Sequence, residues 1–548
     1  MFHIVAYKNR VSGNDLHNEE PRSDVKKVPF TNFLPSLSEN EILAEEFSYL
    51  VAKTWTTHIP SLQRYGENLP HHLSHVYENE MKQKTEKVHL GVLEKNEQYG
   101  DDMLDILDYI NQYVPKHSDD TPEKILSGGD YLTFERHKEA QSQKQDSPTA
   151  YQCLEGLVAK IEDFHAQAEW QKVIWHHLYS TASSKDIGTL YAARNATNSR
   201  NVSSDPHRDF YANAELLDKF TNAYVITGGV HHFGMTNMND RPLTNNYSGD
   251  DSADSKKEYI LKEARKFVDK YVMNQVPKLE DTAPRSINDY SCKYCGKMYI
   301  RPKNLEKHEK THETSSTISD THHIEQGADE DQVYNYTQCT LTLLLLRLNH
   351  NDAIKHGDGE RILRLYKYFY LYYKVSNCPK YAYATLELLA QVQCLLSPRL
   401  AHRLTWNRSV NWQGKIDTNH PMDLDIEHDN KVFKDDVTSY RGEITERTIN
   451  RVSRSINTTE AILNHYDKVT KIRKASGKHT RQDTTDDVYT LVAQFTDARL
   501  FELTTGRHHS AFPRIQANPL SKLDMVAFKS WLSKSLKAFS NKHYYKTV

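Results

Sequence analysis

Cysteine is scarce in this chain of 548 residues, which has only six. Cys292 and Cys295 lie close together, whereas the other four are scattered along the sequence. Small secreted domains are stabilised by densely and regularly spaced cysteines, and this distribution excludes such a disulfide framework. It indicates a protein of a reducing compartment, nuclear or cytoplasmic.

Long hydrophobic runs and an excess of charge of one sign are also missing. The longest apolar run, Leu341 to Leu346 with one threonine, is far too short to cross a bilayer. No basic stretch precedes the apolar residues 2–6, which therefore predict a buried strand and not a signal peptide. The formal net charge is −3, so only a local basic patch could bind nucleic acid. We expect no membrane partner, and no motif indicates a small-molecule substrate.

A short stretch in the middle of the chain has the residues of a zinc site. Cys292, Cys295, His308 and His312 are spaced C-x2-C-x12-H-x3-H. Zn²⁺ prefers four thiolate and imidazole ligands in a tetrahedron. The two histidines, at i and i+4, share one face of a helix, and Pro302 suits the first turn of that helix. We predict one structural zinc ion here.

Three apolar residues complete this pattern. Tyr290, Tyr299 and Leu305 stand at the spacing Y-x-C-x2-C-x3-Y-x5-L-x2-H-x3-H. With so few large apolar residues, the metal must supply much of the folding energy. The segment 290–312 resembles the two-Cys, two-His zinc-finger family, which implies a ββα unit. A chance array of two thiols and two imidazoles is the alternative, and the three apolar positions disfavour it.

The resemblance also implies which side chains would face a DNA major groove, namely Arg301, Lys303, Asn304 and Lys307. The segment 290–312 contains six Lys and Arg against two Glu, so it favours phosphate. One finger reads only about three base pairs. DNA binding and a structural clip for a protein partner therefore remain alternatives.

Outside the finger, apolar periodicity predicts an α+β chain that is mostly helical. Ser38 and Glu41 predict a capping box in front of a helix with a buried stripe that includes Leu43 and Phe47. The predicted strands are 88–92 and 124–130. The predicted helices are 104–113, 133–145, 257–273, 334–349, 361–375, 381–396 and 444–466.

Several short phrases outside the finger occur in a familiar order. They are FLPS at 33–36, GGDYLTFER at 128–136, LEGL at 154–157, EDFH at 162–165, GTLY at 188–191, GDGER at 357–361, LSPR at 396–399, DLDIEHDN at 423–430 and GRHH at 506–509. Together they resemble a domain family of unknown function from transposon-rich animal genomes, which looks like a transposase with a ribonuclease-H-like core. The resemblance covers most of the chain and implies a large helical insertion that carries the finger.

With this resemblance, the chain divides into six parts. They are an N-terminal α/β part (1–120), a central part of the core (121–235), a linker and helix (236–289), the finger (290–312), an acidic flexible link (313–332) and a helical C-terminal part (333–548).

A transposase-like core needs three carboxylates that hold two Mg²⁺ ions. Asp130, at the end of a predicted strand, is the candidate for the middle acid, and Glu427 is the candidate for the last one, with Asp163 and His165 as a weaker alternative. The resemblance places the first acid upstream of the stretch similar to residues 2–10. We therefore predict a protein without turnover, with Mg²⁺ bound only if the acidic site is active. Ordinary turn and surface roles for Asp130 and Glu427 remain the alternative.

Overall fold

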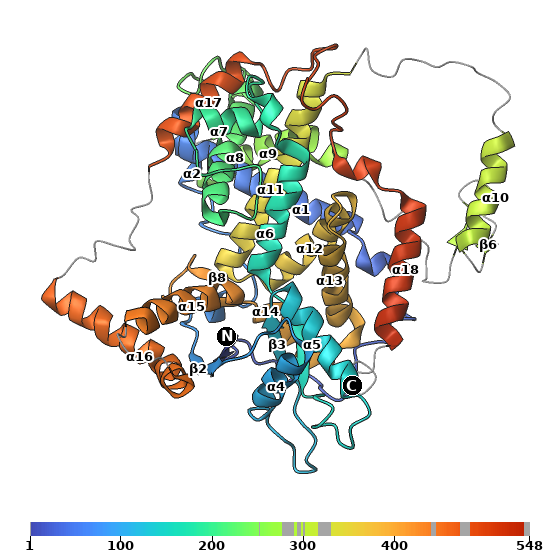
Figure 1. The fold of residues 1–548 in the computed structure, drawn as a ribbon. Coiled ribbons are helices and arrows are strands. Elements are labelled where there is room, and N and C mark those ends of the chain that lie inside the picture. Colours follow the sequence, from blue (N-terminus) through green and yellow to red (C-terminus); the bar gives the residue numbers. More distant parts are fainter. Residues whose placement is uncertain are drawn as a thin grey trace.

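The computed structural model describes residues 2–250, 252–276, 290–292, 298–299, 302–315, 330–439, 445–471 and 483–541. Within these residues the chain is mostly helical and contains small two-stranded sheets (Figure 1). This confirms the predicted mostly helical α+β class. No helix of the described residues is both long and apolar enough to cross a membrane.

The strands of the described residues form four separate pairs. The antiparallel pairs are β1 (Phe2–Tyr7) with β2 (Lys87–Leu93), β5 (Tyr290–Ser291) with β6 (Met298–Tyr299), and β7 (Ser409–Asn411) with β8 (Asn419–Pro421). The parallel pair is β3 (Ile125–Gly129) with β4 (Leu157–Ile161). Strands were therefore predicted at the right places for β2 and β3, whereas a ribonuclease-H-like core stays a prediction.

Helices make up most of the remaining chain. The first nine are α1 (Leu37–His58), α2 (Gln63–Gly66), α3 (Glu78–Met81), α4 (Gly100–Asn111), α5 (Tyr131–Gln143), α6 (Asp163–Leu178), α7 (Leu190–Ala196), α8 (Phe210–His232) and α9 (Ala253–Tyr271). The later ones are α10 (Pro302–Ser315), α11 (Gln332–His356), α12 (Gly359–Val375), α13 (Pro379–Ala390), α14 (Pro398–Trp406), α15 (Met422–Ser439), α16 (Glu446–Thr470), α17 (Thr485–Asp497) and α18 (Met525–Asn541).

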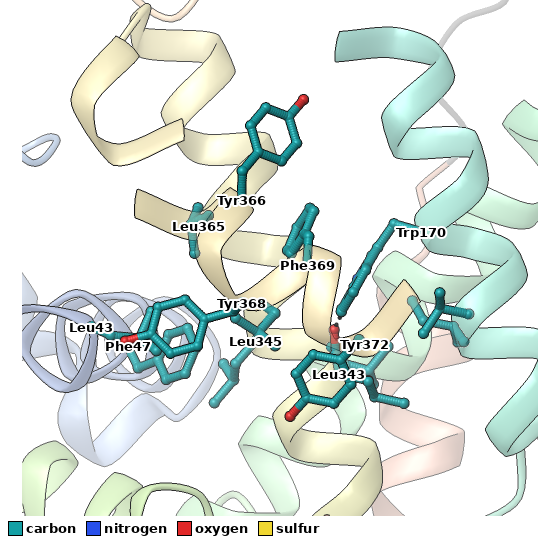
Figure 2. Close-up of a cluster of buried hydrophobic side chains, with 14 of the residues drawn as sticks. Leu43, Phe47, Trp170, Leu343, Leu345, Leu365, Tyr366, Tyr368, Phe369 and Tyr372 are labelled. Atoms are coloured by element: carbon teal, nitrogen blue, oxygen red, sulfur yellow. Dashed lines mark hydrogen bonds between the residues drawn. The ribbon is translucent and has the colours of Figure 1, made fainter. Parts of the chain in front are cut away.

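The largest hydrophobic core lies among α1, α6, α8, α11, α12 and α13. Figure 2 shows Trp170 of α6 stacked on Phe369 of α12. The ring centroids are 4.1 Å apart and the ring planes are 8° from parallel. Helix α11 is buried on most of its surface, which explains why its sequence is leucine-rich on every side. Buried tyrosines of α12 still find partners for their hydroxyls. Tyr370 donates to the Phe33 carbonyl at 2.7 Å and Tyr373 to the Ala166 carbonyl at 3.0 Å.

The start of α1 corrects one prediction. The capping box is formed by Ser36 and Glu39, and not by Ser38 and Glu41. The Glu39 N–H donates to Ser36 Oγ at 3.1 Å, and the Ser36 N–H donates to the Glu39 carboxylate at 2.9 Å. Both serines have a glutamate three residues later, so the sequence pattern alone is ambiguous. The fully buried Leu34 anchors the chain just before Ser36, and this fixes the earlier start.

Candidate functional site

The predicted finger segment forms a small ββα unit. β5 and β6 pair antiparallel, with Tyr290 opposite Tyr299, and α10 packs against both strands. Cys292 and Leu305 are buried together in a cluster of their own, separate from the main core. Figure 1 shows β6 and α10 at the edge of the molecule, beyond α18. The order strand, strand, helix is the one that the resemblance implied, whereas zinc binding stays a prediction.

Part of the predicted zinc site can be placed. Cys292 is buried at the end of β5, and His308 is half-buried on α10 three residues after Leu305. Cys295 lies outside the described residues, and His312 lies in α10 with its side chain outside them. Thiolate and imidazole are the ligands that Zn²⁺ prefers. Cys292 follows β5 and His308 lies on α10, and β5 packs against α10, so these two candidate ligands fit a zinc ion.

The predicted nucleic-acid contacts are partly described as well. Asn304 and Lys307 are exposed and lie three residues apart on α10, so they share one face of the helix. Lys303 belongs to the same helix with its side chain outside the described residues, and Arg301 lies outside them altogether. Lys310, on the next turn, pairs with Glu306 at 2.9 Å.

The second candidate site begins at the end of β3, where Asp130 was predicted to stand. Its carboxylate accepts a hydrogen bond from the Thr133 N–H at 2.7 Å and so caps α5. The Thr133 hydroxyl donates to Glu97. Burial raises the pKa of Glu97, and the negative charge of Asp130 raises it further. Two carboxylates therefore meet at this strand end.

His165 connects this strand end with α15. Its Nδ1 lies 2.9 Å from Asp423, and the backbone N–H groups of Phe164 and His165 donate to the same carboxylate at 3.0 and 3.1 Å. Asp423 thus binds the N-terminus of α6, where the helix dipole favours a negative charge. Burial lowers the pKa of His165, but Asp423, then Asp130 and Glu427, raise it above its ordinary value. The two predicted acids therefore act on one imidazole.

This arrangement predicts how His165 titrates. Because its pKa is raised in the folded protein, its charge stabilises the fold below about pH 6.5, and this stabilisation is lost as the pH rises through the raised pKa. Asp423→Asn should lower the pKa of His165 more than Glu427→Gln does, since only Asp423 is hydrogen-bonded to the ring. NMR titration of the imidazole measures both shifts, and equal shifts would contradict this geometry.

Asp163, the weaker candidate, has a structural role. Its carboxylate is buried and receives hydrogen bonds from Arg408, at 2.6 Å for Nη2 and 3.0 Å for Nε, and from the Tyr366 hydroxyl. Burial raises the pKa of Asp163, but Arg408 more than offsets this and holds the pKa below its ordinary value. All of these partners are protein groups, so Asp163 is a poor metal ligand, whereas Glu427 is exposed to solvent.

Other acids of α15 are also engaged. Asp425 binds Lys87 at 2.8 Å and Asp429 binds it at 2.7 Å, which ties β2 to α15. In the part of the chain that is described, no three His, Cys, Asp or Glu side chains are close enough together to hold a metal ion. The acids near His165, namely Glu97, Asp130, Asp423 and Glu427, thus lie at separate points around it, and we call them the acidic cluster.

Two members of the acidic cluster were not predicted as site residues. Glu97 lies in a polar loop after β2, where nothing in the sequence marks it. Asp423 carried a signal, since it precedes Glu427 by four residues and so lies on the same face of α15.

Comparison with known proteins places the chain in a family. The sequence model of a family described as Family of unknown function (DUF6589) matches residues 25–479, which is most of the chain and includes residues 290–312 and the acidic cluster. No curated protein and no solved structure matches the chain.

Proposed function

Because the chain belongs to this family of unknown function, whose description assigns no activity, we propose a function from its own residues: it binds one structural zinc ion and, through α10, nucleic acid. In this proposal the protein derives from a transposase and has no catalytic turnover. The observation that carries it is the ββα unit, in which Cys292 and Leu305 form a separate cluster beside His308.

The helix of this unit supports contact with nucleic acid. Asn304 and Lys307 are exposed on one face of α10. An asparagine amide can pair with the N6 and N7 edge of adenine, and a lysine can reach guanine or phosphate. Because one such unit contacts few base pairs, we expect binding that is weak and strongly dependent on salt.

A gel-shift titration of the zinc-loaded protein on short duplex DNA tests this proposal. Lys307→Ala should weaken binding and lower the slope of log K against log salt by about one, the value for one lost phosphate contact. Lys310→Ala is the matched control, because it removes the same charge from the same helix at a lysine paired with Glu306. It should change binding less.

A different result would change the assignment. If the protein binds zinc but shifts no DNA at low salt, nucleic-acid binding is wrong. The finger would then be a structural clip, and a protein partner should be captured equally well after nuclease treatment.

An active Mg²⁺-dependent nuclease or transposase is the second candidate. It is favoured by Asp130, Asp423 and Glu427, whose charges all act on His165. Carboxylate oxygens are the ligands that Mg²⁺ prefers. Against it, Asp423 already receives three hydrogen bonds from α6.

A nicking assay on supercoiled DNA separates the two candidates. We expect no product with Mg²⁺ present. Cleavage that depends on Mg²⁺ and disappears in Asp130→Asn would establish the nuclease instead.

A further inference from the structure

Two of the small sheets face one cavity. β1 pairs on one edge with β2, and β3 pairs on one edge with β4, and within the described residues neither strand has a second neighbour. A cavity of about 300 Å³ is lined by all of β1 and by β3 as far as Gly128. We call it the β1–β3 groove. Strands at the edge of a sheet normally present unpaired N–H and C=O groups to solvent, so two such edges on one groove are unusual.

The backbone of β3 shows which groups face the groove. The Ile125 N–H donates to the Gly156 carbonyl at 2.8 Å, so the backbone N–H and C=O groups of Ile125 point towards β4. Successive residues of a strand alternate the direction of their backbone groups. Leu126 and Gly128 therefore direct their N–H and C=O groups away from β4, and no other described backbone group bonds to them. These groups are available to another strand.

The groove is covered on both faces. Phe2 of β1 and Ile125 of β3 both pack against a small hydrophobic cluster that includes Met103 and Leu107 of α4. Leu126, whose side chain points the opposite way from that of Ile125, packs against the main core. Further apolar lining comes from α14 and α15, at Leu400, Met422 and Ile426. A strand placed here would be enclosed by helices on both faces, and such strands are apolar on both sides.

An unsatisfied carboxylate marks the same groove. Glu162 lines it, is 5% exposed, and pairs through Oε1 with Lys160. Its Oε2 is buried and has no hydrogen-bond partner among the described residues. A side chain at Gly128 would overlap the Glu162 carboxylate, so the glycine lets it lie against the strand. A buried acceptor without a partner is costly, and a donor from a bound segment would satisfy it.

We propose that the β1–β3 groove takes up an extended segment of another polypeptide as a strand, which joins the two strand pairs into a single sheet. The segment is about five residues of apolar, mainly β-branched character, to match the length of β3 and the covered faces. This mode of recognition adds a strand through main-chain hydrogen bonds.

Fluorescence anisotropy with the full chain tests the proposal. The probe is a labelled peptide of about seven residues with a valine and isoleucine centre and glutamates at both ends, a typical strand length. Two further probes carry N-methyl groups on the odd or on the even residues of the centre. A strand between two neighbours uses both of its edges, so each methylated peptide should bind at least about tenfold more weakly. One methylated peptide that binds as well as the parent would contradict insertion between β1 and β3.

A pair of variants locates the binding site. Leu126→Pro removes one N–H from the groove edge and leaves the pairing of Ile125 with β4 in place, and proline is tolerated on edge strands. It should weaken binding of the parent peptide about fivefold, the usual effect of one lost hydrogen bond at about 1 kcal/mol. Leu126→Val keeps the N–H and should bind like the unaltered protein.

Hydrogen exchange provides a readout that does not depend on the variants. The amides of Leu126 and Gly128 should become protected when the parent peptide binds. Unchanged exchange at both amides, equal affinity of the two Leu126 variants, or no binding of the parent peptide would each overturn the proposal.

Discussion

Replacing Asp163 with asparagine should destabilise the protein by about 3–5 kcal/mol, the usual cost of breaking a buried ion pair by removing one partner. Asp163 and the guanidinium of Arg408 are each only 1% exposed, so water cannot replace the lost charge. Arg408 also donates to the Ile161 carbonyl at 3.1 Å, which connects the end of β4 to the same pair. Urea unfolding monitored by tryptophan fluorescence measures the loss.

Glu427→Gln is the control for this variant. Glu427 is exposed, and surface substitutions usually stay within about 0.5 kcal/mol. If Asp163→Asn changed the unfolding free energy as little as Glu427→Gln does, the structural role of Asp163 would be wrong. The double variant Asp163→Asn with Arg408→Met should recover part of the lost stability, because it removes the unpaired buried charge.

The second large effect concerns the metal. Cys292→Ser should reduce the zinc content from about one ion per chain to near zero, since apparent binding energies of about 10–16 kcal/mol in such units depend on thiolate ligands. The main core should keep its unfolding midpoint, because Cys292 and Leu305 form a separate cluster. All six tryptophans lie outside 290–312, so their fluorescence reports on the rest of the chain.

Cys153→Ser serves as the matched control. Cys153 is also buried, at 7% exposed, but it packs in the loop that precedes β4. This variant should retain zinc. Equal zinc content in Cys292→Ser and Cys153→Ser would show that Cys292 is not a ligand.

The sequence predicted several helices and strands because local signals determine them. Gly128 and Gly129 followed by Asp130 marked the end of a strand in front of a predicted helix, and β3 and α5 meet there. The boundary of α1 was missed because Ser36 and Ser38 offer the same capping pattern, and only the burial of Leu34 chooses between them. Strand pairing depends on contacts that are distant in sequence. The groove between β1 and β3 therefore could not be predicted from periodicity.

The two candidate sites differ in how far apart their residues lie in the sequence. The candidate zinc ligands and their apolar neighbours lie within 23 residues, from Tyr290 to His312, so the resemblance that implies a ββα unit can be seen in the sequence itself. The acidic cluster brings Glu97 and Asp130 together with His165, Asp423 and Glu427. Asp423 and Glu427 lie about 260 residues after His165 in the sequence. Its members could be suggested one at a time, but only the fold shows that they influence one imidazole, and that Asp163 is occupied by Arg408.

X-ray absorption spectroscopy at the zinc edge of the purified protein tests the central claim most directly. The account predicts one zinc ion per chain, with two sulfur ligands at about 2.3 Å and two nitrogen ligands at about 2.0–2.1 Å. Protein without stoichiometric zinc, or zinc surrounded only by oxygen and nitrogen, would contradict it.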